Sequence, residues 1–289
     1  MRIAHLSDFH FTRMTFNPLR LFSKRGIGML NWLFLRRSGF DLRHLDPIPQ
    51  LLQEQQVDLV LLGGDFTTTA LQEEFEKAQE FVQKIKTPWI AIPGNHDCYT
   101  YRSARQFHFY RYFVNRRRQI LHPVEFFTLK QHRVEAHHLI NHWWLVALDT
   151  AVATNPYSSE GAFLQEQQNH LQELFSLLPR DASILLFNHY PFFQNDERRR
   201  NLRRAECLMQ CIQKEPRIRL YLHGHTHRHI LADLRPNQLP IVLDSGSATQ
   251  KNRGSWNLID LQEHGCQITP YHWQGSWKRS QTETFLWQQ

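Results

Sequence analysis

Short apolar segments alternate with longer, polar-faced segments along this 289-residue chain. Apolar runs of four to eight residues bounded by turn residues are typical of buried strands. Such runs lie at residues 3–6, 57–62, 89–92, 184–187 and 218–222. Helices with a polar face are expected at residues 47–56, 70–86, 163–178 and 202–213. Further strands are expected within 134–149 and at 241–243, 256–260 and 267–273. Strands that alternate with helices in this way are typical of an α/β fold.

Each of the five apolar runs is followed by side chains that bind hard metal ions. The segments are Asp8-Phe9-His10, Gly64-Asp65, Gly94-Asn95-His96-Asp97, Asn188-His189 and Gly224-His225-Thr226-His227. In open α/β sheets, binding sites form where strands end, because the sheet holds the backbone while the loops carry polar groups. We therefore expect the five segments to converge on one edge of the fold.

The ligand types indicate the class of metal. Asp, Asn and His offer oxygen and imidazole nitrogen, which suit Mn, Fe, Zn or Co, and no thiolate lies in any of the five segments. His225 and His227 are one residue apart and would point to opposite faces of an extended segment, so each could serve a different ion. Asp65 could bridge the two ions with its two oxygens. Two ions about 3.5–4 Å apart clamp the attacking and leaving oxygens of a displacement at phosphorus. The pattern therefore predicts a two-metal hydrolase of phosphate esters or anhydrides.

In type and order, the five segments resemble the motifs of the calcineurin-like metallophosphoesterase family, which are D-x-H, G-D, G-N-H-D/E, H and G-H-x-H. The resemblance spans residues 8–227. It implies a two-sheet αββα sandwich, which we expect to form one domain over residues 1–289. It also implies two divalent metal ions, manganese first, with iron or zinc as alternatives. One departure follows Gly64-Asp65, where many relatives carry a further acidic residue and this chain does not. Substrate handling of the protein-phosphatase type is therefore not expected.

Carried over position by position, the resemblance implies a role for each motif residue. One ion would be held by Asp8, His10, Asp65 and His227, and the other by Asp65, Asn95, His189 and His225. His96 would be the acid, or the hydrogen-bond donor, for the leaving oxygen. Asp97 would orient the imidazole of His96, which is the usual way to fix a histidine tautomer. Of the other histidines, six near motifs or strands are interpreted as structural, namely His5, His137, His138, His142, His223 and His229.

Composition is consistent with one compact enzyme. At 289 residues with 41% hydrophobic content, the chain can bury a sizeable core. Its four cysteines do not suggest a disulfide framework. The N-terminus leads directly into the first strand without a signal-peptide pattern. The apolar runs are far shorter than the ~20 residues needed to cross a bilayer. We therefore expect a cytoplasmic location.

The segment at residues 13–43 follows the first motif, which places it beside the metals. It contains seven basic residues and one acid, a net charge of +6 against +7 for the whole chain. Apolar residues lie between the charges, among them Phe16, Phe22 and residues 32–35. Basic residues interleaved with Trp, Phe and Leu suit a segment that lies in an anionic membrane surface. The alternative is a helical cap on the domain itself, with its arginines turned outward.

Three functions are consistent with these features. The first is hydrolysis of a phosphodiester or pyrophosphate bond in a membrane-associated nucleotide-lipid, by a protein peripheral to the inner face of the membrane. The chain resembles the family branch that cleaves UDP-2,3-diacylglucosamine in lipid A synthesis. The second is a soluble cyclic-nucleotide phosphodiesterase or nuclease, with nucleic acid the less favoured substrate. The third is a non-catalytic scaffold, against which the complete ligand set argues. No obligate protein partner is indicated, and the arginine clusters at 102–118 and 198–204 could steer a polyanionic substrate.

Overall fold

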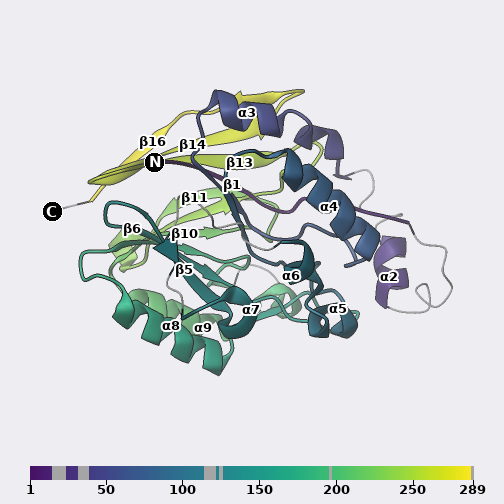
Figure 1. The fold of residues 1–289 in the computed structure, drawn as a ribbon, viewed down its shortest axis with the longest axis horizontal. Helices are drawn as coiled ribbons and strands as arrows, with labels where there is room; N and C mark the ends of the chain where they lie inside the picture. The colour runs from purple at the N-terminus through teal and green to yellow at the C-terminus, as the bar shows by residue number, and fades with distance from the viewer. Residues whose placement is uncertain (15–23, 32–38, 114–121, 124–125, 195–196, 288–289) are drawn as a thin grey trace.

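Two β-sheets lie in the middle of the molecule, and helices cover the outer side of each (Figure 1). The computed structural model describes the chain except for residues 15–23, 32–38, 114–121, 124–125, 195–196 and 288–289. This arrangement is the predicted α/β sandwich of two sheets between helices, so the expected fold class is confirmed.

The first sheet has the strand order β15-β14-β13-β1-β2-β3, and β16 also pairs with β14. Its strands are β1 (Arg2–Leu6), β2 (Leu59–Leu62), β3 (Trp89–Ala91), β13 (Ser255–Gln262), β14 (Gly265–Trp273), β15 (Trp277–Arg279) and β16 (Glu283–Leu286). Strands β1, β2 and β3 run parallel, whereas β13 is antiparallel to β1. The carboxyl ends of β1, β2 and β3 therefore lie on the same edge of the sheet.

The second sheet has the strand order β11-β12-β10-β8-β6-β5-β4. Its strands are β4 (His122–Pro123), β5 (Val134–Ile140), β6 (Trp143–Leu148), β8 (Ser183–Phe187), β10 (Ile218–His223), β11 (His229–Asp233) and β12 (Ile241–Ser245). Strands β6, β8, β10 and β12 are parallel to their neighbours in this series. A separate short ladder joins β7 (Gly161–Ala162) and β9 (Leu202–Arg203). The central strands again end on one edge.

Four helices form the outer layers. Helices α3 (Ile48–Glu54) and α4 (Gln72–Lys84) lie on the first sheet, and α8 (Gln165–Leu177) and α9 (Ala205–Gln213) lie on the second (Figure 1). The other helical elements are α2 (Lys24–Asn31), α5 (Tyr101–Arg105), α6 (His108–Tyr112), α7 (Leu129–His132) and the 3-10 turns η3 (Leu42–Leu45), η4 (Arg198–Arg200) and η5 (Arg235–Asn237).

Strand β2 shows why the central strands are apolar at successive positions. Val60 and Leu62 belong to the core cluster that contains Phe75 of α4. Leu59 and Leu61 belong to the cluster between the two sheets. Successive side chains of a strand point to opposite faces, and both faces of this strand are buried. A strand covered on both sides is read in the sequence as a continuous apolar run.

The predicted helices and strands are present, with ends that differ by up to three residues. The apolar pattern does not predict β11, β15 and β16, because these strands are partly exposed and carry no apolar run of four or more residues. It also does not predict the short helices α5, α6 and α7.

All four cysteines are free, as expected. No helix in the described part of the chain has the length and apolar character needed to cross a membrane.

Candidate metal centre

The five motif segments begin at the carboxyl ends of five strands. In the first sheet, Asp8 follows β1, Asp65 follows β2 and Asn95 follows β3. In the second sheet, His189 follows β8 and His225 follows β10. A hydrogen bond joins the two sets, since the backbone N of His225 donates to Asp8 Oδ2 at 3.0 Å. The segments therefore meet between the two sheets, at the edge that the sequence indicated.

The loops that carry the motif residues have a left-handed backbone at five of them. The φ angles are 59° at Asp8, 51° at His10, 54° at Asp65, 70° at His225 and 55° at His227. Residues with a side chain adopt this region infrequently, and such residues gather at functional sites. The prediction that His225 and His227 diverge because their segment is extended is therefore wrong. They diverge through two left-handed turns.

Two motif glycines are required by the close approach of the loops after β2 and β3. Gly64 has a φ of +96°, and a Cβ at this position would lie 2.6 Å from the backbone N of Gly94. A Cβ on Gly94 would lie 2.5 Å from the backbone N of Asp65. Because neither glycine has a Cβ, Asp65 fits against the neighbouring loop, where the backbone N of His96 donates to Asp65 Oδ1 at 2.8 Å.

Four side chains form the first donor cluster. Asp8, His10, Asp65 and His227 each offer one ligand atom, and these atoms lie within 4.8 Å of one another. Nε2 of His227 lies 3.0 Å from Nε2 of His10 and 3.0 Å from Asp8 Oδ1. Nε2 of His10 lies 4.0 Å from Asp65 Oδ2. The structure thus brings together the four residues expected to hold one ion.

A second donor cluster shares Asp65 with the first. Asp65, His189 and His225 offer ligand atoms within 4.8 Å of one another. Asp65 presents Oδ1 to this side, 3.5 Å from His189 Nε2, and Oδ2 to the first cluster. Asn95 precedes His96, whose backbone N binds Asp65, and Asn95 is itself buried. The two carboxylate oxygens of Asp65 therefore face two different sets of donors.

The donor atoms fit two divalent cations. Asp8 Oδ1, Asn95 Oδ1 and His189 Nε2 are among the buried side-chain atoms that have no partner in hydrogen-bonding geometry in the described part of the chain. Buried polar atoms without a partner are costly, and a cation in each cluster would supply a partner to these three atoms, which belong to predicted ligands. The 3.0 Å between the Nε2 atoms of His10 and His227 also suits two nitrogens that bind one ion, each at about 2.0–2.1 Å.

Backbone carbonyls select the ligand nitrogen of two histidines. A carbonyl oxygen can only accept, so Nδ1 of His189 donates to Gly63 O at 2.7 Å and leaves Nε2 facing Asp65. Nε2 of His225 donates to Arg200 O at 2.8 Å, which leaves Nδ1 for the second cluster. Partners of this kind orient metal-binding imidazoles in proteins generally.

The protonation states at neutral pH suit cation binding. Burial acts to raise the pKa of Asp8 and Asp65, but the neighbouring histidines outweigh it and hold both pKa values below the usual range. Burial lowers the pKa of His10 well below its usual value and that of His225 to about 3. Burial also acts to lower the pKa of His189, but the Asp65 carboxylate outweighs it and raises this pKa to about 9. A cation at the second cluster must therefore displace a proton from His189.

The structure corrects the role assigned to Asp97. Its carboxylate accepts hydrogen bonds from the backbone N of Gly94, Phe66 and Thr67, at 3.0, 3.3 and 3.0 Å. The imidazole of His96 is oriented by a backbone carbonyl instead, because its Nδ1 lies 2.6 Å from Thr68 O. Asp97 therefore ties the loop after β2 to the loop after β3. Sequence adjacency alone suggested the wrong partner.

Residues 244–249, which the sequence analysis did not select, support both sets of ligand loops. Asp244 is fully buried and accepts a hydrogen bond from the hydroxyl of Thr226, between the two histidines of the last motif. Ser247 Oγ donates to Asp8 O at 2.7 Å, and Thr249 Oγ1 donates to Phe9 O at 3.0 Å. One signal was present in the sequence, because Asp244 ends an apolar strand as the motif residues do.

The described parts of the 13–43 segment lie against this centre, as expected. The ring of Phe40 packs edge-on against His10, with centroids 5.0 Å apart, and against His227, with centroids 5.6 Å apart. Arg25 of α2 donates to the backbone carbonyls of Thr69 and Ala70, after β2. The described portion therefore packs on its own fold. The apolar residues Phe16 and 32–35 lie outside the described residues.

The hydroxyl of Thr226 is expected to matter for metal affinity. Thr226→Val keeps the shape of the side chain but removes the hydrogen bond to Asp244, so the loop that carries His225 and His227 loses its support. We expect Mn²⁺ affinity, measured by calorimetry, to fall about 10- to 100-fold, the usual effect of losing such a partner. Thr282→Val, which removes a hydroxyl bonded to Thr269, is the control. Unchanged affinity in Thr226→Val would contradict the supporting role.

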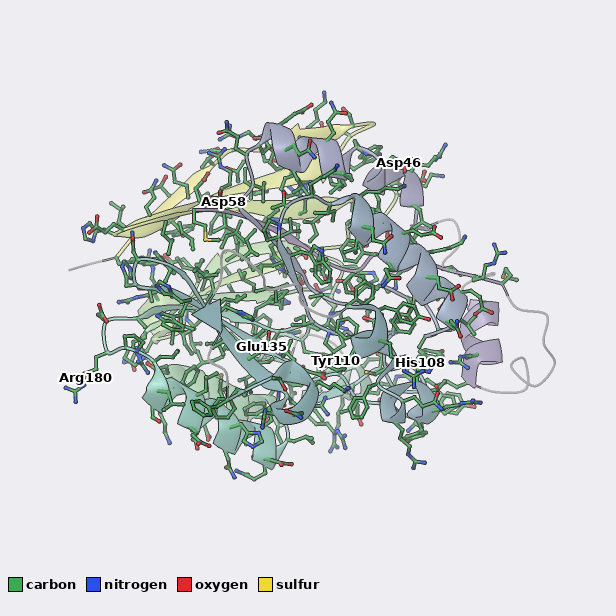
Figure 2. All side chains as sticks on the ribbon, viewed as in Figure 1. Asp46, Asp58, His108, Tyr110, Glu135 and Arg180 are labelled. Carbon is green, nitrogen blue, oxygen red and sulfur yellow. The ribbon has the colours of Figure 1, made fainter. Side chains whose placement is uncertain are left out.

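The histidines interpreted as structural lie in strands, in a turn or in the core. His5 and His223 are fully buried in β1 and β10. His137 is buried in β5, where its Nε2 lies 2.6 Å from Oε1 of Glu135, which is labelled in Figure 2. Nε2 of His229 lies 2.7 Å from Asn257 Oδ1. Within the described residues, the donor clusters that could hold a cation do not include these histidines.

Comparisons with known proteins agree with this geometry. The chain is 28% identical over 134 residues to a probable glycerophosphodiester phosphodiesterase from Arcobacter nitrofigilis, which covers 46% of this chain and 42% of that protein. It is 22% identical over 175 residues to a 3′,5′-cyclic-nucleotide phosphodiesterase from a Nostoc species, covering 60% and 57%. The chain thus spans about half the length of these curated relatives.

The fold and the sequence point to the same group of proteins. A crystal structure of a dimetal phosphatase from Danio rerio matches with a TM-score of 0.66 at 12% identity, over 100% of this chain and 99% of that chain. At this identity the match concerns the fold. The sequence profile described as calcineurin-like phosphoesterase matches residues 1–229. Since this match includes all five motif segments, the chain belongs to the calcineurin-like phosphoesterase family.

Proposed function

We propose that this protein is a dinuclear metal-dependent hydrolase of phosphodiester or pyrophosphate bonds. The observation that carries the proposal is the pair of donor clusters that share Asp65, one oxygen facing each. Asp8, His10, Asp65 and His227 would hold one cation, and Asp65, Asn95, His189 and His225 the other. A bound pair of divalent cations neutralises the phosphoryl oxygens and aligns the attacking and leaving oxygens.

In this proposal His96 supplies the proton of the reaction. Its Nδ1 is held by Thr68 O, so Nε2 is the nitrogen that would hold a proton for the leaving oxygen. The imidazole lines a pocket next to the donor clusters, and its ring centroid lies 4.9 Å from that of His10. His96 can therefore reach a phosphoryl group held at the centre, and a positioned acid is required wherever the leaving group is an alkoxide.

Two substrate classes follow from different observations. The two relatives, a probable glycerophosphodiester phosphodiesterase and a 3′,5′-cyclic-nucleotide phosphodiesterase, support a small phosphodiester such as a glycerophosphodiester or a cyclic nucleotide. The composition of residues 13–43 supports a membrane-associated nucleotide-lipid such as UDP-2,3-diacylglucosamine, bound by a peripheral protein. Both classes contain the phosphorus–oxygen bond that the centre would cleave. A non-catalytic scaffold is the remaining candidate, and it gives no reason to retain seven ligands in two clusters.

A substrate screen with defined metal content tests the proposal. We expect metal-stripped protein to be inactive and Mn²⁺ to restore hydrolysis of bis(p-nitrophenyl) phosphate. The same preparation should then be offered cyclic AMP, and UDP-2,3-diacylglucosamine with and without detergent. Activity that depends on detergent or liposomes supports the lipid, whereas detergent-independent cleavage of cyclic AMP supports the small phosphodiester. Two bound metal ions without hydrolysis of any ester would contradict the enzyme and support the scaffold.

A further inference from the structure

A pocket beside the donor clusters is built by elements from five parts of the chain. Its lining residues come from α2, from the loops after β2, β3 and β6, and from the turn η4. Asn95 and His96 are among them, so the pocket opens directly onto the proposed metal centre. We call it the α2 pocket. Whatever group it binds is attached to the phosphorus atom that reacts, if the proposed function holds.

Helix α2 is fixed in place by polar contacts on two sides. Arg25 Nε and Nη2 donate to the backbone carbonyls of Thr69 and Ala70 at 3.0 and 2.9 Å. On the other side, Lys24 Nζ donates to the carbonyl and to the hydroxyl of Thr154, both at 3.0 Å. A Cβ on Gly28 would meet Tyr99, so the helix also lies close to the loop after β3. These contacts hold the ammonium of Lys24 at the pocket.

Among the described residues, no carboxylate forms an ion pair with Lys24. Within the part of the chain that the structure describes, its ammonium contacts the neutral groups of Thr154 and the ring face of Tyr99, 4.4 Å from the centroid. The ring of Tyr99 stacks on that of His96, with centroids 5.7 Å apart. Burial lowers the pKa of Lys24 to about 8, which leaves it mainly charged at neutral pH. A partly buried cation without a counter-ion is stabilised by an anionic ligand.

The remaining lining residues agree with an anionic ligand. Arg199 and Arg200 lie at the same pocket, together with the hydroxyl-bearing residues Ser158 and Ser159. The described lining contains no carboxylate. Arg199 is the weaker cation, because it is exposed and pairs with Glu197 at 2.6 Å. Lys24, which is partly buried, is therefore stabilised more by a negative group than Arg199 is.

We infer that the α2 pocket binds a second anionic group of the substrate, and that Lys24 selects substrates that carry one. The substrate class is then a phosphodiester or pyrophosphate with another phosphate near the reacting phosphorus, rather than a phosphodiester with a single negative charge. The reaction in this inference rests on the proposed function. The preference for a second phosphate rests only on the residues of the pocket.

A matched pair of esters tests the inference. One is p-nitrophenyl thymidine 5′-phosphate, and the other is the same ester with a second phosphate on the 3′ oxygen. Wild-type protein loaded with Mn²⁺ should prefer the second ester. Lys24→Met should reduce kcat/KM for that ester roughly 10- to 100-fold, mainly through KM, which is the worth of one hydrogen bond to a charged group. For the first ester, kcat/KM should fall less than about threefold. Lys24→Arg should recover part of the preference.

Controls separate this inference from the reaction itself. Lys130→Met removes a lysine that also lies over an aromatic ring, 5.4 Å from the centroid of Phe107, and should leave the preference unchanged. Calorimetry with thymidine 3′,5′-bisphosphate and thymidine 5′-phosphate measures the same preference without turnover. Cleavage of both esters with a preference that persists in Lys24→Met, or with equal losses for both, overturns the inference and leaves the proposed function intact. A Lys24-dependent preference in binding without any turnover overturns the proposed function and supports the pocket.

Discussion

Asp65→Asn is expected to remove phosphodiester hydrolysis together with the second bound metal ion. Each oxygen of this carboxylate faces a different donor cluster, so an amide in its place loses both the bridging charge and one ligand atom. We expect kcat/KM for bis(p-nitrophenyl) phosphate to fall by roughly 10³-fold or more, since the loss of a single charge-stabilising group already costs roughly 10²–10³ in kcat. Elemental analysis should show fewer than two ions per chain.

The stability of the metal-free protein should also fall. Burial and the charge of Asp8 both act against the Asp65 carboxylate, but the neighbouring histidines outweigh them and hold the pKa of Asp65 below its usual range. The folded protein therefore favours the ionised carboxylate, and metal-free Asp65→Asn should melt below the temperature of the metal-free wild type. Wild-type protein should gain stability with Mn²⁺, about 2.7 kcal/mol at a hundredfold excess over Kd, and the variant should lose most of this gain. Calorimetric melting curves with and without Mn²⁺ measure both effects.

Asp58→Asn is the matched control for this variant. Asp58 is exposed and lies just before β2, whereas Asp65 follows the same strand (Figure 2). Its Oδ2 accepts a hydrogen bond from the backbone N of Arg2, which an asparagine oxygen can also accept. The control should keep two ions and full activity. Full activity in Asp65→Asn, or two ions bound with unchanged affinity, would contradict the shared-ligand arrangement.

The features that the sequence predicted well are those set by local patterns. Strands such as β2 and β8 are buried on both faces, so their apolar runs are continuous and easily found. Parallel strands bring their carboxyl ends to one edge, which is why Asp65 and His225 could be placed together although 160 positions separate them in the sequence. Residue type and strand topology were therefore sufficient to predict most of the metal ligands.

The features that the sequence did not reveal depend on tertiary contacts. Asp97 adjoins His96 in the chain, but its carboxylate accepts hydrogen bonds from backbone N atoms in two loops, the one after β2 and the one after β3. The left-handed turn at His225 follows from packing against Asp8, to which its backbone N donates. Asp244 supports the last motif from a neighbouring strand. None of these partners is encoded by spacing or by residue type alone.

The same distinction applies to helix α2. Composition marked the 13–43 segment as basic and apolar, which two readings could explain equally well. The contacts of Lys24 and Arg25 resolve the described part, because both side chains bind backbone carbonyls beside the centre. Residues 24–31 form a helix that contacts the domain, and Arg25 points toward the domain rather than outward as the helical-cap alternative expected. Membrane contact through the apolar residues at 32–35 stays a separate prediction.

His96→Gln is expected to reduce kcat according to the leaving group. A glutamine can donate a hydrogen bond but cannot deliver a proton, so the loss should be largest where the leaving oxygen is an alkoxide. For a dinucleoside monophosphate we expect a fall of about 10²–10⁴, the usual contribution of a general acid. For p-nitrophenyl thymidine 5′-phosphate, whose leaving group departs as a stable anion, the fall should be much smaller. Metal content should remain two ions per chain, because the imidazole is not among the expected ligands.

His108→Gln provides the control for this substitution. His108 lies on α6, labelled in Figure 2, where its Nε2 lies 2.9 Å from Gln106 Oε1, and it does not line the α2 pocket. The control should cleave both substrates at the wild-type rate. Equal losses on the two substrates in His96→Gln would instead assign His96 to phosphate binding, since a hydrogen bond to the phosphoryl group is made whatever the leaving group. The ratio of the two rate losses therefore decides between proton transfer and binding as the role of this imidazole.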